Sequence, residues 1–277
     1  MNRRKAMTIA AGVIVGGGAG LLTMTNAFKP EIMFDNKPHK LDYKQLDDDW
    51  KYSPLDPSVT TELAYKYYAE GSCMYATVKS IISQLVEKIG EPYKSFPIHL
   101  FKYGHGGVGG YGSICGALNG AAALIGLLVS DNGVRDNIIA DVFRWYEKEP
   151  LPEFNPQISS YDYIPVKSIS QSILCHASNT NWCKTAGFKA NSNERKERCR
   201  RMTSDVVKKV TISLNEVFTD NYTTNVYTDE TVNTCVTCHG STGKVNNTAA
   251  KMSCNSCHTE SVGHRVFSDI HYKLMRE

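Results

Sequence analysis

The chain has 277 residues, with 31 Lys and Arg against 28 Asp and Glu, which gives a formal charge of +3 at pH 7. The charges are scattered, and the densest basic stretch, 195–201, is interrupted by Glu197 and Cys199, so we interpret it as a solvated helix face and exclude nucleic acid as a partner. At 42% hydrophobic residues, the chain is long enough to bury a core as one large domain or two small ones.

Residues 1–27 have the pattern of an export signal. Arg3 and Arg4 precede an uncharged stretch, 6–24, and a small-residue cleavage site at 25–27. The paired arginines and the glycine-rich stretch are typical of the twin-arginine route. We therefore expect a periplasmic or other extracytoplasmic protein, whose membrane contact is limited to the signal if it stays uncleaved.

The next segment, 28–56, is rich in proline and charge and is predicted to be an extended arm. Helical periodicity begins at Asp56-Pro57-Ser58, is broken at Gly71-Ser72, and resumes at Cys73 in an amphipathic helix that ends at Gly90. These two helices open a predicted helical domain, 57–218.

A glycine-rich loop follows at 103–112. Its glycines match G-x-G-x-x-G, but no strand precedes the loop, so we exclude dinucleotide binding and expect a close backbone approach to a neighbour. Small residues at 113–123 predict a helix packed tightly against a neighbour or a cofactor. Two more helices are predicted, around 134–146 and from about Asn193 to Val217. The predicted fold class is mostly α, with about five helices and an irregular segment at 219–277.

That last segment carries two C-x-x-C-H pentapeptides, the attachment signature of haem c. The first is Cys235-Val236-Thr237-Cys238-His239 and the second is Cys254-Asn255-Ser256-Cys257-His258. In each, the two thiols would bond to one porphyrin, and the histidine would be the proximal iron ligand. We therefore predict two haem c groups per chain.

A zinc ribbon held by the same four cysteines is the alternative, although a ribbon does not need histidine after both pairs. The segment has too few apolar residues to cover two porphyrins, so the haems must pack against the helical domain or against a second subunit.

Five further cysteines lie outside the haem motifs: Cys73, Cys115, Cys175, Cys183 and Cys199. Disulfides are usual in an exported protein, but five is an odd number. Cys73 and Cys115 lie near predicted helix starts, where the helix dipole stabilises a thiolate suited to an iron–sulfur cluster. The residues themselves leave both readings open.

Several of these motifs resemble the C_GCAxxG_C_C family of redox-active helical proteins. The similarity lies in Glu70 to Ala76, Gly104 to Gly110, Cys115-Gly116-Ala117-Leu118-Asn119-Gly120 and the later cysteines, although Cys115 and Gly116 are in reverse order relative to the family motif. With two C-terminal haem motifs, the arrangement over about 60–277 is similar to the split-Soret cytochromes c.

This resemblance implies a homodimer with the haems near the subunit interface. It also implies two bis-His haems per chain and an iron–sulfur centre, [2Fe–2S] or another type, held by the family cysteines. Cys73 and Cys115 are the direct matches, and the residues do not decide which of the later three complete the set.

The distal haem ligands are expected to be His264 and His271, which follow the second haem motif. A bis-His haem has no vacant site and only exchanges electrons, so the predicted function is electron transfer between redox partner proteins in anaerobic metabolism, and an electron carrier is favoured over an enzyme. The alternative is a small-molecule reductase that uses a five-coordinate haem or the cysteine site.

Overall fold

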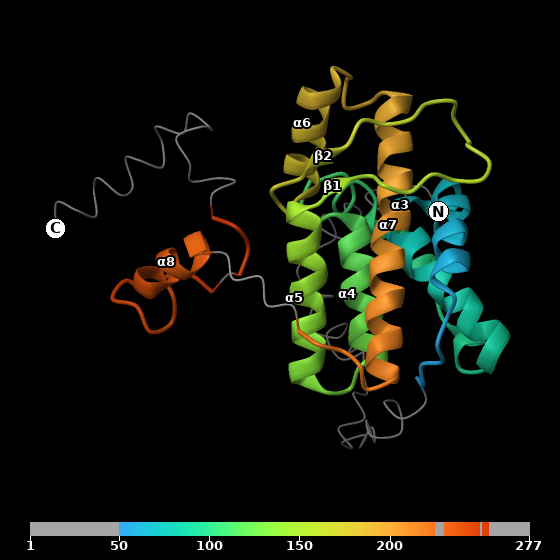
Figure 1. Cartoon of the computed structure of the whole chain (residues 1–277), viewed down its shortest axis with the longest axis horizontal. Helices are drawn as coiled ribbons and strands as arrows, with labels where there is room; N and C mark the ends of the chain where they lie inside the picture. Colours follow the sequence, from blue (N-terminus) through green and yellow to red (C-terminus); the bar gives the residue numbers. More distant parts are fainter. Residues whose placement is uncertain (1–49, 225–229, 250, 255–277) are drawn as a thin grey trace, which may run out of the picture. The chain divides into compact units, whose positions relative to one another are not determined.

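The computed structural model describes residues 50–224, 230–249 and 251–254. The predicted export signal and most of the predicted arm lie outside these ranges. Within 57–218 there are five α-helices: α3 (Pro57–Ile89), α4 (Gly116–Leu128), α5 (Asn132–Lys148), α6 (Cys175–Ala186) and α7 (Asn193–Phe218) (Figure 1). Two short 3₁₀ helices, η1 (Tyr93–Ser95) and η2 (Ile98–Gly104), lie between α3 and α4. The predicted mostly α class is confirmed.

Helix α3 begins and bends where the sequence indicated. The Asp56 carboxylate accepts a hydrogen bond from the Ser58 N–H at 2.7 Å, which caps the helix. The predicted break at Gly71-Ser72 is instead a kink within one helix, with Ser72 at φ +65°. Cys73 therefore starts the second half of α3 rather than a separate helix.

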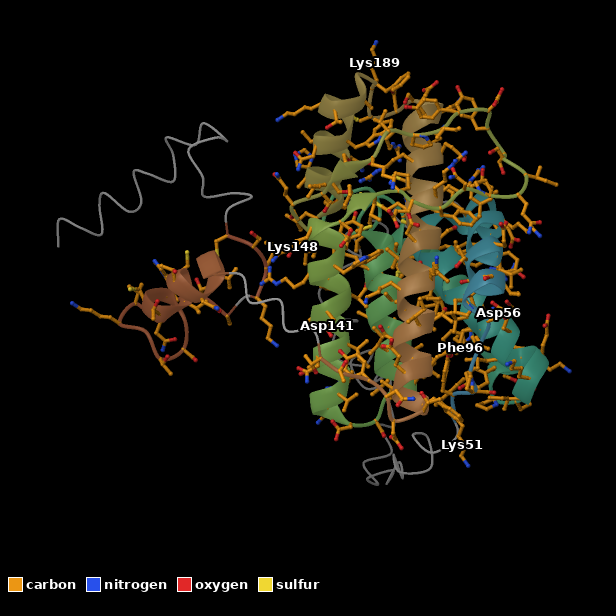
Figure 2. The ribbon with its side chains drawn as sticks, viewed as in Figure 1. Lys51, Asp56, Phe96, Asp141, Lys148 and Lys189 are labelled. Carbon is orange, nitrogen blue, oxygen red and sulfur yellow. The ribbon has the colours of Figure 1, made fainter. Side chains whose placement is uncertain are left out.

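The core lies between α3, α4, α5 and α7, and the most extensive contact is between α3 and α7. Side chains fill the spaces between these helices (Figure 2). The apolar face predicted for the second half of α3 is buried at Met74, Val78, Ile81, Ile82 and Leu85, whereas Ile89 at the helix end is exposed. The periodicity therefore identified the buried face of this helix.

The end of the predicted arm, from residue 50, is extended and packs on this core. Leu55 is buried, and its backbone N–H and C=O both bond the side chain of Asn215 on α7, at 3.0 and 2.8 Å. Trp50 meets Tyr93 and Phe96 edge to face. These residues therefore belong to the folded body.

Two helices were not predicted. Helix α6 is polar, with only Ser178 and Trp182 fully buried, so it lacks an apolar stripe to read. Helix α8 (Glu230–His239) lies in the segment predicted to be irregular and contains the first haem motif. No helix in the described ranges is long and apolar enough to cross a bilayer.

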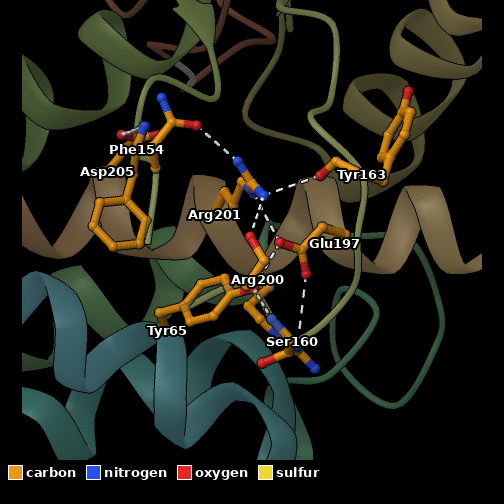
Figure 3. Close-up of polar contacts among 10 residues, drawn as sticks. Tyr65, Phe154, Ser160, Tyr163, Glu197, Arg200, Arg201 and Asp205 are labelled. Atoms are coloured by element: carbon orange, nitrogen blue, oxygen red, sulfur yellow. Dashed lines mark hydrogen bonds and ion pairs between the residues drawn. The ribbon is translucent and has the colours of Figure 1, made fainter. Parts of the chain in front are cut away.

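A two-residue antiparallel pairing, also not predicted, joins β1 (Pro150–Leu151) to β2 (Ser168–Ile169), with Pro150 opposite Ile169. The buried side chain of Arg201 ties the connection between these strands, 152–167, to α7. The Arg201 guanidinium donates to Glu197 at 2.8 Å and to acceptors on the connection, and the Tyr65 hydroxyl also donates to Glu197 (Figure 3). This network holds the connection against α7 and against Tyr65 of α3.

Candidate functional site

Four of the five cysteines outside the haem motifs meet in one place. They come from four segments: Cys73 follows the kink of α3, Cys115 is the N-cap of α4, Cys175 is the first residue of α6, and Cys199 lies in α7. Every pair among these four thiols is close enough for the charge of one to oppose ionisation of another. We call these residues the four-cysteine site.

The site is largely closed to solvent. Cys73, Cys115 and Cys199 are buried, and Cys175 is half-buried. Burial raises the pKa of Cys73 and of Cys115, and it raises the pKa of Cys175 to about 12. Backbone N–H groups of Ala117 and Leu118, in the first turn of α4, act in the opposite direction on Cys115. The helix starts thus favour a thiolate where burial opposes one.

The glycine-rich loop closes one side of this site. A Cβ at Gly107 would lie 2.8 Å from the Cβ of Cys175, and the Gly107 backbone is at φ +70°. A Cβ at Gly116, next to Cys115, would lie 2.4 Å from the Sγ of Cys73. The close backbone approach expected of the loop and of the small residues is therefore found, and its target is the cysteines.

Two arginines of α7 border the site. The guanidinium groups of Arg195 and Arg198 place their Nη1 atoms 4.0 and 3.9 Å from the Sγ of Cys199. The Asn179 side chain, on α6, donates to the Sγ of Cys175 at 3.3 Å. Cationic and amide donors at thiol sulfur stabilise the ionised form.

Cys183 stands apart from the four-cysteine site. It lies eight residues after Cys175 in α6, is half-buried, and its ionisation is influenced by Cys199 alone among the described cysteines. The sequence could not choose among the three later cysteines, and the geometry separates Cys183 from Cys175 and Cys199.

No disulfide joins one described cysteine to another. In the described ranges, no three His, Cys, Asp or Glu side chains are arranged to hold a metal ion as they stand. The four thiols are thus near one another, but they do not converge as the ligands of a single ion do.

The first haem motif lies at the end of α8. Cys235 and Cys238 are three residues apart on one turn, and both side chains are at least partly accessible. The Nδ1 of His239 lies 2.9 Å from the Oδ1 of Asn247. A protonated Nδ1 donating to this oxygen assigns the ring's lone pair to Nε2, the nitrogen suited to bind iron.

The second haem motif is described only as far as Cys254, which is half-buried. Cys257, His258, His264 and His271 lie outside the described residues, so their predicted roles stay predictions. Asn247 as a partner of the proximal histidine was missed, because an asparagine eight residues downstream carries no sequence signal.

Comparison with known proteins finds a family and a relative that agree with each other. Residues 75–213 match the family described as "Putative redox-active protein (C_GCAxxG_C_C)". The chain is 34% identical over 218 residues to the split-Soret cytochrome c of Desulfovibrio desulfuricans (strain ATCC 27774 / DSM 6949 / MB). The aligned region covers 76% of this chain and 77% of that protein.

A solved structure of the split-Soret cytochrome c from Desulfovibrio desulfuricans ATCC 27774, which is described as having a novel iron centre, superposes with a TM-score of 0.70. The two chains are 33% identical, and the match covers 76% of this chain and 90% of that one. The resemblance noted from the motifs is thereby confirmed in both sequence and structure. This chain belongs to the split-Soret cytochrome c family and contains its C_GCAxxG_C_C domain.

Proposed function

We propose that this chain is an exported c-type cytochrome that transfers electrons through two haem c groups and an iron–sulfur centre. The single observation that carries the proposal is the meeting of four cysteines from four segments in one largely buried site, in a chain that also has two C-x-x-C-H motifs. Thiols brought together from distant points in a sequence are expected of a metal centre rather than of packing alone.

The four-cysteine site fits an iron–sulfur cluster by its donors. Thiolate sulfur is the usual ligand of such clusters, and a cluster spreads its ligands over more than one iron, which suits thiols that do not converge on a single ion. The Nε of buried Arg198 has no hydrogen-bond partner in the protein, which is consistent with an anionic group bound beside it. In this proposal Cys73, Cys115, Cys175 and Cys199 hold the cluster, and Cys183 does not.

The haem sites are proposed from the motifs and from one contact. Cys235, Cys238 and His239 would hold the first haem, and the Asn247 side chain would orient the proximal imidazole. Cys254, Cys257 and His258 would hold the second. His264 and His271 remain the proposed distal ligands, and a homodimer with haems near its interface remains the proposed assembly.

Haem c and an iron–sulfur cluster supply one-electron chemistry when bound. The residues of this chain would exclude water from the cluster by burying three of its four thiols, and would set its charge environment through Arg195 and Arg198. Haem c is attached outside the cytoplasm, so we propose a periplasmic or other extracytoplasmic location, reached through the signal at 1–27.

The test is a metal and haem inventory of the mature protein. A pyridine haemochrome assay should give two haem c groups per chain, total iron should exceed the haem iron, and acid-labile sulfide should be present. Haem iron with no excess iron or sulfide would remove the cluster. If the oxidised protein showed a high-spin absorption band that shifts when nitrite is added, the small-molecule reductase would be favoured over electron transfer.

A further inference from the structure

Arg198 is a buried cation without a carboxylate partner in the part of the chain that the structure describes. Its side chain is 1% exposed. Its Nη2 donates to the Ser178 hydroxyl at 2.9 Å, its Nη1 lies 3.9 Å from the Sγ of Cys199, and its Nε has no partner. The contacts of its charged end are therefore one hydroxyl and one sulfur.

A second buried arginine on the same helix shows the contrast. Arg201 is 2% exposed and donates to the Glu197 carboxylate at 2.8 Å and to three oxygens of the 152–167 connection. Burying a charge without a partner costs several kcal/mol, roughly. Arg201 has its counter-charge in the protein, whereas Arg198 needs one from the four-cysteine site.

The hydroxyls next to Arg198 extend its influence to a second cysteine. A guanidinium only donates, so Ser178 accepts from Arg198 and its own proton faces Tyr146, whose oxygen lies 2.8 Å away. The Tyr146 proton is then left for Cys115, whose pKa that hydroxyl lowers. Ser178 and Tyr146 are both buried, so this chain of donors is shielded from water.

We propose that Arg198 is the counter-charge of the thiolate-held iron centre and raises its reduction potential, directly at Cys199 and through Ser178 and Tyr146 at Cys115. Reduction adds one electron, and hence one negative charge, to the centre. A fixed positive charge a few ångströms away in a water-poor site stabilises that added charge. The inference rests on the proposed iron centre and names the residue that sets its potential.

The test compares Arg198→Met and Arg198→Lys in the mature, haem-loaded protein, by potentiometric titration with mediators and dithionite. Removing the charge should lower the equilibrium constant for reduction of the iron centre about tenfold or more, a shift of about 59 mV for one electron. In Arg198→Lys, which keeps the positive charge, the reduction potential of the iron centre should stay close to the wild-type value. The haem potentials should not move. Lys196→Met, which removes an exposed charge from the same helix, is the matched control and should shift nothing.

An unchanged potential in iron-loaded Arg198→Met would overturn the inference while leaving the proposed function intact. Loss of iron from Arg198→Met with iron retained in Arg198→Lys would support it, and loss from both with helical content kept would contradict it. If Arg198→Met does not fold, Arg195→Met decides, because the half-exposed Arg195 contacts the same sulfur and should give a smaller shift of the same sign. A wild type without excess iron would overturn both proposals.

Discussion

The geometry of helix α6 decides which of its two cysteines, Cys175 or Cys183, can belong to the four-cysteine site. Cys175 and Cys183 are eight residues apart in α6, a rise of about 12 Å, so they cannot both border the same compact centre. From the sequence, the three later cysteines were equivalent, because α6 has no apolar periodicity from which its facing could be read. The structure distinguishes them by what each thiol lies near.

This distinction predicts the iron content of two serine variants. Cys199→Ser should remove most of the iron and acid-labile sulfide beyond the haem iron, since a serine hydroxyl is a poor ligand for such a centre. Cys183→Ser, a matched change on the neighbouring helix, should keep both. Equal losses in the two variants would show that Cys183 belongs to the centre.

The contact between His239 and Asn247 predicts the direction of a haem potential. An acceptor on Nδ1 makes the imidazole a stronger donor to iron and stabilises the oxidised state. Asn247→Ala should therefore raise the potential of one haem, and Asn247→Asp, a stronger acceptor, should lower it. Spectroelectrochemical titration measures both, and shifts of the same sign in the two variants would contradict this role.

At the scale of elements, close helix contact brings Cys73 and Cys115 together. Gly116 in α4 faces the Sγ of Cys73 and the carbonyl of Gly104, each 2.4 Å from where a Cβ would lie, whereas Gly126 in the same helix faces nothing within 4 Å. Gly116→Ala should destabilise the protein by about 1–3 kcal/mol through overpacking.

The control for that variant is Gly126→Ala, which should stabilise by about 0.5–1 kcal/mol through helix propensity. Chemical denaturation followed by circular dichroism measures both free energies of unfolding. A Gly116→Ala protein as stable as wild type would mean that α3 and α4 do not approach as described.

The connection between β1 and β2 carries a pH-dependent anchor. Both carboxylate oxygens of Asp205 accept backbone N–H groups, from Glu153 and Phe154, at 2.9 Å each. Burial raises the pKa of Asp205 to about 7 from its ordinary 3.8. Between these two pKa values the folded state binds the extra proton, so the contribution of Asp205 to stability is fully present below about pH 4 and is lost as pH rises towards 7.

Thermal unfolding between pH 4 and 7 should show this slope, worth at most about 4 kcal/mol, on top of the contributions of other groups. Asp205→Asn should flatten it, because the amide does not titrate. If stability changed with pH as steeply in Asp205→Asn as in the wild type, the titrating group would be a residue other than Asp205.

The helices that could be predicted from the sequence are those with clear caps and an apolar stripe. The second half of α3 and the start of α7 carry caps and an apolar stripe, and the predicted start at Asn193 is one residue from the observed cap, Ser192. Helix α6 and the β1–β2 pair carry neither and were missed. The four-cysteine site was half predictable: helix starts indicated Cys73 and Cys115, while Cys175 and Cys199 depend on tertiary packing.

In the whole molecule, the proposed function requires two kinds of redox site. The helical body holds the four-cysteine site, and the segment from residue 219 holds the two haem motifs. That segment has few apolar residues of its own, so the haems are expected to be covered by the helical body or by a second copy of the chain. Sedimentation of the haem-loaded protein should therefore give a dimer.

Covalent haem attachment is measured by the intact mass of the exported protein under denaturing conditions, alongside a Cys235→Ala, Cys238→Ala double variant. We expect a wild-type polypeptide heavier by two haem groups and a variant heavier by one, with the iron and acid-labile sulfide of the four-cysteine site released in both. A polypeptide that carries no haem mass, with its four tail thiols open to alkylation, would contradict this expectation.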